Sequence, residues 1–300
     1  MSEIQPTRER STLAQIFLSP DEPRLRAGWR LLIQTILYIV LQVLFFLVLI
    51  LFFGPIGSST HSIPLQILNF LATTISVFAA RRWLDKRSIE SLGLKLDGRS
   101  WLDIGVGIAI SLIQMGFIYV AMLGLGWLSF EGFAWEVDPL SIVVSNVFFF
   151  FVVFVFVGWN EEILSRGYHL QTLASGLNMF WAVIISSAVF GLLHLANPNA
   201  TWVSAAGIFF AGVFLAYGYI RTKQLWLPIG LHIGWNFFEG VGFGFPVSGL
   251  ADIYKMLRIQ IHGPEIWTGG AFGPEAGLIV VPALLLGAFL IYLYTIRRET

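Results

Sequence analysis

The chain has 300 residues, of which 56% are hydrophobic and only 12% charged, and its mean hydropathy is +0.77. A soluble domain cannot bury that much apolar surface, so the composition excludes a soluble globular protein and predicts one that crosses a membrane several times. The sequence has no cysteine, which excludes a disulfide framework, a thiolate metal site and a cysteine nucleophile.

The N-terminal segment and the apolar runs define the predicted architecture. Residues 1–29 carry acids and bases and lack a short apolar core with a small-residue cleavage site, so we expect a cytoplasmic segment rather than a cleaved signal peptide. After it, apolar runs close to the ~20 residues that cross a bilayer recur. Eight of these are expected to be membrane helices: 30–53, 63–80, 101–128, 141–163, 178–196, 201–221, 225–243 and 276–296. We therefore predict an all-α polytopic membrane bundle that forms a single domain over 30–300.

Lysine and arginine are distributed unevenly along the chain. Of the 18, all but three fall in segments that eight spans place on one side of the membrane, namely 1–30, 81–99, 221–223 and 297–298. Because cytoplasmic loops are enriched in basic residues, both termini are predicted to be cytoplasmic, in the inner membrane of a bacterium. The segment 81–99 is interpreted as a topology determinant that contacts anionic lipids, not as a nucleic-acid site.

A charged cluster interrupts the fourth apolar run. Glu161, Glu162 and Arg166 follow an uncharged stretch over 142–158. Together they would cost on the order of 8 kcal/mol in a bilayer if they were unpaired. Residues four apart on a helix share a face, whereas neighbours point about 100° apart, so we expect Glu162 to pair with Arg166 and Glu161 to remain free as a general base. The alternative is a purely structural network of ion pairs.

The next apolar run carries a histidine near its end. Glu161 and His194 each lie about 16 residues, or ~25 Å of helix, from the turn that is expected near 176–178. In an antiparallel hairpin, this equal spacing brings the two side chains to the same level. Glu161 lies near the cytoplasmic end of its predicted span, so the hairpin must extend beyond the span or bend. The alternative for His194 is a satisfied core histidine.

A second polar pair lies on the seventh run. His232 and Asn236 are one helical turn apart, so both project from one stripe. A carboxylate, two imidazoles and an amide in an apolar cavity can activate a water and hold an oxyanion, as in a hydrolase. Glu161, His194 and His232 are also able to hold Zn²⁺ or another divalent metal, and spacing does not decide between these uses. Hydrogen bonding between helices is the structural alternative.

Two features are assigned to the opposite, outer side. Glu239 shares the stripe of His232 but lies beside several glycines, and it is expected to be an interfacial carboxylate. The long connection 244–275 contains glycine and proline, and a short helix is expected in it near Ile253–Ile261. No internal repeat is seen, so the paired broken helices of many transporters are not evident.

Three motifs stand in order on successive apolar runs: Glu161-Glu162-x-x-x-Arg166, Phe190-x-x-x-His194 and His232-x-x-x-Asn236. Over about 140–240 this pattern resembles the CPBP family of intramembrane proteases. That family includes type II CAAX prenyl endopeptidases and the bacterial Abi, or bacteriocin-immunity, proteins. The resemblance implies that Glu161 and His194 polarise the attacking water. It also implies that His232 and Asn236 stabilise the oxyanion and that Glu162 and Arg166 support the site.

The sequence therefore predicts an intramembrane endopeptidase that acts on a membrane-associated protein or peptide, either prenylated or of the bacteriocin type. Its partners are expected to be that substrate and membrane lipids, without nucleic acid, and the oligomeric state is left open. The resemblance is compatible with a metalloprotease and with a metal-free glutamate mechanism. Two other classes use the same residues differently: a proton-coupled transporter with a proton relay, and a non-catalytic immunity or scaffold protein.

Overall fold

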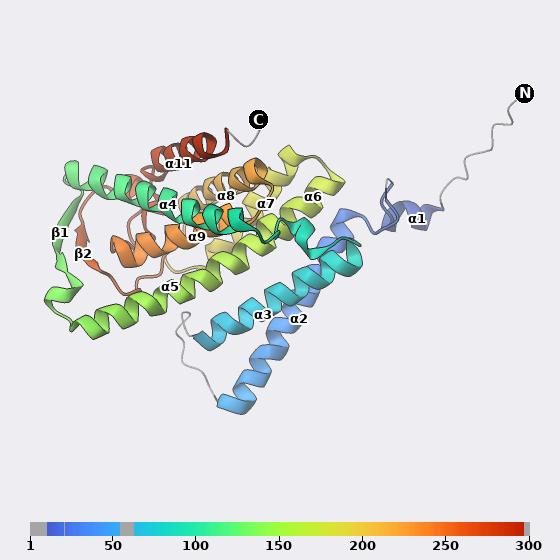
Figure 1. Ribbon diagram of the computed structural model, residues 1–300, viewed down its shortest axis with the longest axis horizontal. Coiled ribbons are helices and arrows are strands. Elements are labelled where there is room, and N and C mark those ends of the chain that lie inside the picture. Colours follow the sequence, from blue (N-terminus) through green and yellow to red (C-terminus); the bar gives the residue numbers. More distant parts are fainter. Residues whose placement is uncertain (1–10, 21, 55–62, 297–300) are drawn as a thin grey trace, which may run out of the picture.

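The computed structural model describes residues 11–20, 22–54 and 63–296, and it confirms an all-α polytopic bundle with one small pair of strands (Figure 1). The α-helices follow in this order: α1 (Thr12–Phe17), α2 (Ala27–Phe53), α3 (Ile63–Ala79), α4 (Gly98–Gly124), α5 (Leu140–Glu162), α6 (Leu170–Gly176), α7 (Met179–Leu193), α8 (Trp202–Thr222), α9 (Trp226–Asn236), α10 (Glu265–Thr268) and α11 (Val280–Thr295). In Figure 1, α2 and α3 diverge from the bundle in which α9 packs against α4, α5 and α8, and α1 lies apart from that bundle.

All eight predicted spans contain helix, but six helical stretches in the described residues are long and apolar enough to cross a membrane. The seventh predicted span corresponds to α9 and the π-helical segment Phe237–Gly242 that follows it. Every residue of α9 is buried, so this 11-residue helix is a core element surrounded by other helices. The eighth corresponds to α11, which is apolar but has 16 residues. Hydropathy does not distinguish a helix buried in protein from one that faces lipid, which explains the difference.

The helix that carries Glu161 is longer than its apolar run. α5 passes through the π-helical segment Ile163–His169 into α6, so one helical stretch covers Leu140–Gly176. The side chain of Asn178 then caps α7 by accepting a hydrogen bond from the Trp181 N–H at 3.0 Å. The hairpin thus extends beyond the predicted span. This extension is what the prediction that Glu161 and His194 lie at the same level of the hairpin requires.

Glycines bring α4 and α9 into close contact. A Cβ atom on Gly230 would lie 2.4 Å from the carbonyl oxygen of Ile104, and one on Gly234 would lie 2.8 Å from the Cα of Ile108. From the other side, a Cβ on Gly107 would lie 2.5 Å from the nitrogen of Leu231. Small residues at such spacing let membrane helices approach backbone to backbone. This contact fixes α9, and with it His232.

Gly230→Ala is expected to destabilise the bundle by about 1–3 kcal/mol, because the new methyl group meets backbone that cannot rotate away. The measurement is thermal unfolding of the purified protein in detergent. Gly105→Ala on α4 is the matched control, since nothing lies within 4 Å of its added Cβ. The control should be neutral or stabilising, because alanine favours helix. Equal melting temperatures for both variants would contradict the packing argument.

The strands close one end of the bundle. β1 (Leu128–Phe133) pairs antiparallel with β2 (Leu257–Ile261), with an irregularity between Phe130 and Gly132. The short helix expected near Ile253–Ile261 is therefore wrong. Residues of β2 alternate between partly buried and exposed, which is the period of a strand and not of a helix.

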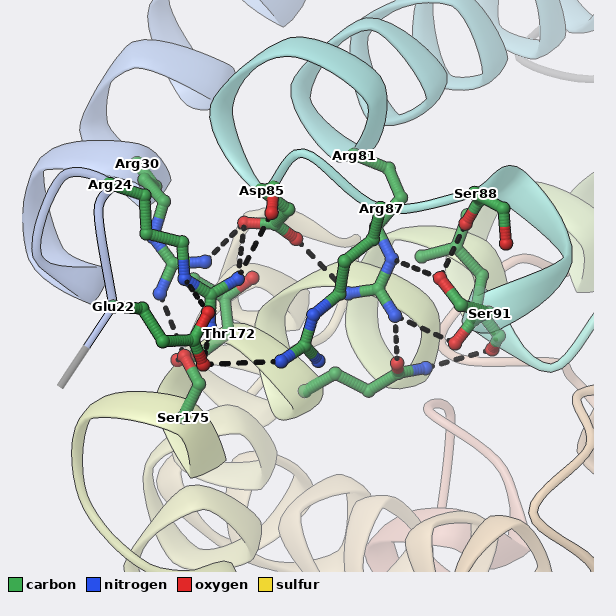
Figure 2. Close-up of polar contacts among 12 residues, drawn as sticks. Glu22, Arg24, Arg30, Arg81, Asp85, Arg87, Ser88, Ser91, Thr172 and Ser175 are labelled. Carbon is green, nitrogen blue, oxygen red and sulfur yellow. Dashed lines mark hydrogen bonds and ion pairs between the residues drawn. The ribbon is translucent and has the colours of Figure 1, made fainter.

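Arginines gather around one carboxylate at the opposite end (Figure 2). The side chain of Asp85 is fully buried and forms ion pairs with Arg30 and, at 3.0 Å, with Arg81. Arg24 donates a hydrogen bond to the Asp85 backbone oxygen at 3.3 Å. The side chains of all three arginines are at least 96% buried. Arg81 is therefore part of the folded core as well as of the basic segment 81–99.

The same arginines reach α6. Arg30 donates to Ser175 Oγ at 2.7 Å, and Arg81 donates to Gln171 Oε1 at 3.0 Å. Ser175 and Gln171 both lie on α6, the continuation of α5. This arginine cluster, defined as Arg24, Arg30 and Arg81 around Asp85, therefore anchors the far end of the helical stretch that carries Glu161.

Candidate active site

The two adjacent glutamates occupy different surroundings. Glu162 is fully buried, and its Oε1 accepts a hydrogen bond from Arg166 Nη1 at 2.8 Å. Glu161 keeps 32% of its side chain exposed, and its Oε2 accepts no hydrogen bond from a described residue. The predicted pairing of Glu162 with Arg166 is confirmed. Glu161 is left as a carboxylate without a fixed partner on its own helix.

Arg166 and Phe190 connect the helices around the site. Arg166 donates to the Gly212 carbonyl on α8 at 3.1 Å, and its guanidinium lies 4.3 Å from the centre of the Phe190 ring on α7. The same ring contacts His194, at 4.8 Å between centroids, and meets the edge of His232 at 6.3 Å. Phe190 is thus a common support for both imidazoles and the arginine.

His194 follows the last residue of α7 and starts a short 3-10 turn. Its Nδ1 donates to the Phe190 carbonyl at 2.8 Å, which leaves Nε2 toward Glu161. The distance from His194 Nε2 to Glu161 Oε2 is 3.7 Å. This is longer than a direct hydrogen bond but short enough for one water to contact both groups. The predicted approach of Glu161 and His194 is therefore present in the structure.

His232 links the two glutamates. Its Nδ1 donates to Glu162 Oε1 at 2.7 Å, and its Nε2 lies 3.7 Å from Glu161 Oε2. The carboxylate of Glu162 therefore orients both Arg166 and His232. His194 and His232 present their Nε2 atoms to the same oxygen of Glu161 at equal distance.

Two of the helices that supply this site, α5 and α9, change their winding at it. α5 ends at Glu162 and α9 ends at Asn236, and each continues as a π-helical segment. π-helical turns occur frequently at functional sites, because the extra residue in a turn changes the direction of the following side chains. Asn236 itself is 7% exposed.

The site lines a cavity of about 360 Å³. Four of the predicted residues border it: Glu161, His194, His232 and Asn236. Most of its remaining wall is apolar and includes Phe154, Val157, Leu193, Phe214, Leu231 and Leu284. Such a cavity can hold water near the polar groups and a hydrophobic substrate along the walls. Glu162 and Arg166 lie behind it, in the protein core.

One carboxylate at the cavity comes from the outer connection 244–275 and was not predicted from the sequence. Glu275 borders the cavity and is 5% exposed. Its oxygens accept hydrogen bonds from Trp235 Nε1 at 3.0 Å and from Ser248 Oγ at 2.6 Å. Asn197, just after the His194 turn, donates to the Ser248 carbonyl at 3.0 Å. The sequence gives no signal for this residue, because a single acid in a glycine-rich connection is typical of a surface loop.

The interpretation of Glu239 as an interfacial carboxylate is wrong. The residue is fully buried, and neither carboxylate oxygen accepts a hydrogen bond from a described residue. The glycines that indicated a surface instead allow close packing: a Cβ on Gly240 would lie 2.8 Å from Val247.

Binding of a divalent metal by the three residues named from the sequence stays a prediction. Glu161, His194 and His232 converge, but within the described residues no group of three or more His, Cys, Asp or Glu side chains has a geometry that could hold a metal ion. Their polar atoms lie 3.7 Å apart, and a single water can bridge that separation.

Comparison with known proteins agrees with the helical bundle and the motifs. Residues 143–238 match the family described as "Type II CAAX prenyl endopeptidase Rce1-like". The chain is also 28% identical over 215 residues to the "Putative membrane peptidase YdiL" of Bacillus subtilis (strain 168). That match covers 69% of this chain and 80% of the relative. Three motifs on packed apolar helices and two matches to membrane peptidases together support a CPBP family intramembrane protease.

Proposed function

We propose that this protein hydrolyses a peptide bond of a membrane-associated protein or peptide with a water molecule activated by Glu161. The observation that carries the proposal is the position of the Glu161 carboxylate, 3.7 Å from the Nε2 atoms of both His194 and His232 in a cavity with apolar walls. A water between these groups has a proton acceptor on one side and room for a substrate carbonyl on the other.

Glu161 and His194 activate the water together, with Glu161 as the general base. Glu161 takes a proton from the water as its oxygen attacks the scissile carbonyl, and His194, with Nδ1 held by the Phe190 carbonyl, accepts a hydrogen bond from the same water at Nε2. When the tetrahedral intermediate collapses, the carbon–nitrogen bond breaks and Glu161 returns the proton to the leaving amine. The carboxylate is regenerated for the next cycle.

His232 and Asn236 have the role of stabilising the oxyanion. In its doubly protonated form, His232 donates one N–H to Glu162 and offers the other, on Nε2, to the substrate oxygen. Asn236 lies one turn away on the same helix and adds an amide donor at the cavity. Glu162 and Arg166 orient His232 from behind and do not contact the substrate.

The substrate class follows from the walls of the cavity. A lipid-modified or strongly apolar segment fits the phenylalanine and leucine side chains around Glu161, and prenylated and bacteriocin-type peptides are both of this kind. Arg30 and Arg81 lie in basic segments at one end of the bundle. Because basic residues are enriched on the cytoplasmic side, they support an orientation in a bacterial inner membrane with this end cytoplasmic.

The test uses protein reconstituted in liposomes. Wild type and His194→Ala are each incubated with a bacterial membrane-protein extract, and new N termini are identified by N-terminal labelling and mass spectrometry. We expect new termini with wild type that are absent with His194→Ala. A quenched peptide that ends in a farnesylated CAAX sequence and its unprenylated twin then separate the substrate classes. Addition of EDTA separates a metal-free mechanism, in which cleavage persists, from a metal-dependent one, in which cleavage is lost. The absence of wild-type cleavage in every arm would contradict the proposal.

A further inference from the structure

Asn160, next to Glu161, has no role in the chemistry above. It is 3% exposed, and neither its Oδ1 nor its Nδ2 makes a hydrogen bond with a described residue. A buried carboxamide without a partner is destabilising, because the group has lost its hydrogen bonds to water and gained none in return. The residue is therefore unlike Asn178 and Asn197, whose side chains are used by the fold.

Asn160 lies on the wall of the catalytic cavity. Val157, Asn160, Glu161 and Leu164 all border the cavity. Their spacing of three, four and seven residues is that of one helix face, so Asn160 shares this face with the proposed base.

A second carboxamide with unused donors lies on the neighbouring helix. Asn69 on α3 also borders the cavity, and its Oδ1 accepts hydrogen bonds from Gln42 at 2.6 Å and Tyr38 at 3.0 Å. Its Nδ2 donates to no described residue. The next residue, Phe70, packs its ring 5.9 Å from that of Trp159, the neighbour of Asn160. The two carboxamides thus belong to adjoining stretches of α3 and α5.

The unused groups are complementary to a peptide backbone. A carboxamide offers one acceptor and two donors, so it can accept from the N–H of one peptide unit and donate to a carbonyl. An acyl or prenyl chain has no such groups. Building on the proposed function, we propose that Asn160, assisted by Asn69, binds a backbone amide of the substrate beside the scissile bond and so selects a peptide segment for hydrolysis.

The test is a comparison of Asn160→Leu with wild type on a peptide cleaved in the assay described above. Leucine keeps the volume and removes both hydrogen-bonding groups. We expect KM to rise about tenfold with kcat nearly unchanged, since the contact is made before and during the reaction. Thermal stability should be equal or higher, because an unpaired polar group is removed. Asn146→Leu on the same helix is the control, since Asn146 donates to its own helix at the Ile142 carbonyl, away from the cavity.

Ester substitution in the substrate gives a readout that a structural role would not affect. Each peptide bond near the cleaved one is replaced in turn by an ester, which removes its N–H. For the wild-type enzyme, the ester at one position should lower kcat/KM about tenfold relative to the all-amide peptide. For Asn160→Leu, the ester at that position should not lower kcat/KM further. Asn69→Leu should raise KM in the same direction but also lower stability, because three hydrogen bonds to its Oδ1 are lost.

The outcomes separate this inference from the proposed function. If wild type cleaves, His194→Ala does not, and Asn160→Leu keeps both the KM and the ester sensitivity of wild type, only the role of Asn160 is overturned. If wild type cleaves nothing, both fail. A loss of stability in Asn160→Leu with unchanged KM would identify a packing residue and would also overturn the inference.

Discussion

Glu161→Gln is expected to lower kcat for peptide hydrolysis by about 10²–10⁴-fold, the usual contribution of a positioned general base. Glutamine has almost the same shape, but it cannot take a proton from water. Because Glu161 Oε2 accepts no hydrogen bond from a described residue, the fold loses no hydrogen bond at this oxygen, and the melting temperature should be unchanged or higher. The measurements are single-turnover kinetics on a substrate found in liposomes and thermal unfolding of the same preparation.

Glu162→Gln is the matched comparison, one residue away. Here the carboxylate is buried and receives hydrogen bonds from Arg166 at 2.8 Å and His232 at 2.7 Å. Removing one partner of a buried ion pair costs about 3–5 kcal/mol, so this variant should be clearly less stable. Its activity should fall because His232 loses its orientation. Residual hydrolysis near the wild-type rate in Glu161→Gln, or stability loss in both variants alike, would refute the division of roles between the two glutamates.

Asp85→Asn is expected to destabilise the protein by about 3–5 kcal/mol. The substitution keeps the shape of the side chain but removes the carboxylate that Arg30 and Arg81 share in the arginine cluster (Figure 2). Two buried guanidinium groups would then lose this counter-charge, and burial of a charge that has lost its partner is among the largest single-residue costs. Denaturant or thermal unfolding in detergent measures the effect.

Glu90→Gln is the control for this experiment. Glu90 lies in the same connector but is exposed, so its charge is solvated and its removal should change stability little. Because the cluster holds α6 through Ser175 and Gln171, activity of Asp85→Asn should fall in proportion to the unfolded fraction, with an unchanged KM in the folded protein. A melting temperature equal to that of wild type would show that the arginines need no counter-charge.

Local spacing predicts part of the site correctly. The pairing of Glu162 with Arg166 depends only on helix geometry, because side chains four residues apart share a face whatever surrounds the helix. The approach of Glu161 to His194 needs one more assumption, a tight antiparallel hairpin, and equal contour lengths then set the level of the two residues. Both predictions depend on contacts within one helix or between two consecutive helices. Such contacts can be predicted from the sequence.

Contacts between distant helices could not be predicted in this way. The hydrogen bond from His232 to Glu162 depends on the position of α9 in the bundle. This position follows from the close backbone contact of Gly230 with Ile104. Glu275 reaches the cavity from a connection in which hydropathy and helical periodicity give no information. Its hydrogen bonds to Trp235 and Ser248 exist only after the outer connection has folded against α9.

The sequence by itself determined the membrane class, the order of the motifs and the self-paired Glu162–Arg166 unit, because these depend on composition and on the 3.6-residue period of a helix. Only the tertiary structure decided that α9 is a buried core helix, that both imidazoles face one oxygen of Glu161, and that Asn160 at the cavity makes no hydrogen bond with a described residue. The physical reason is that burial and hydrogen-bond partners are set by packing between helices, whereas spacing along one helix sets only which residues share a face.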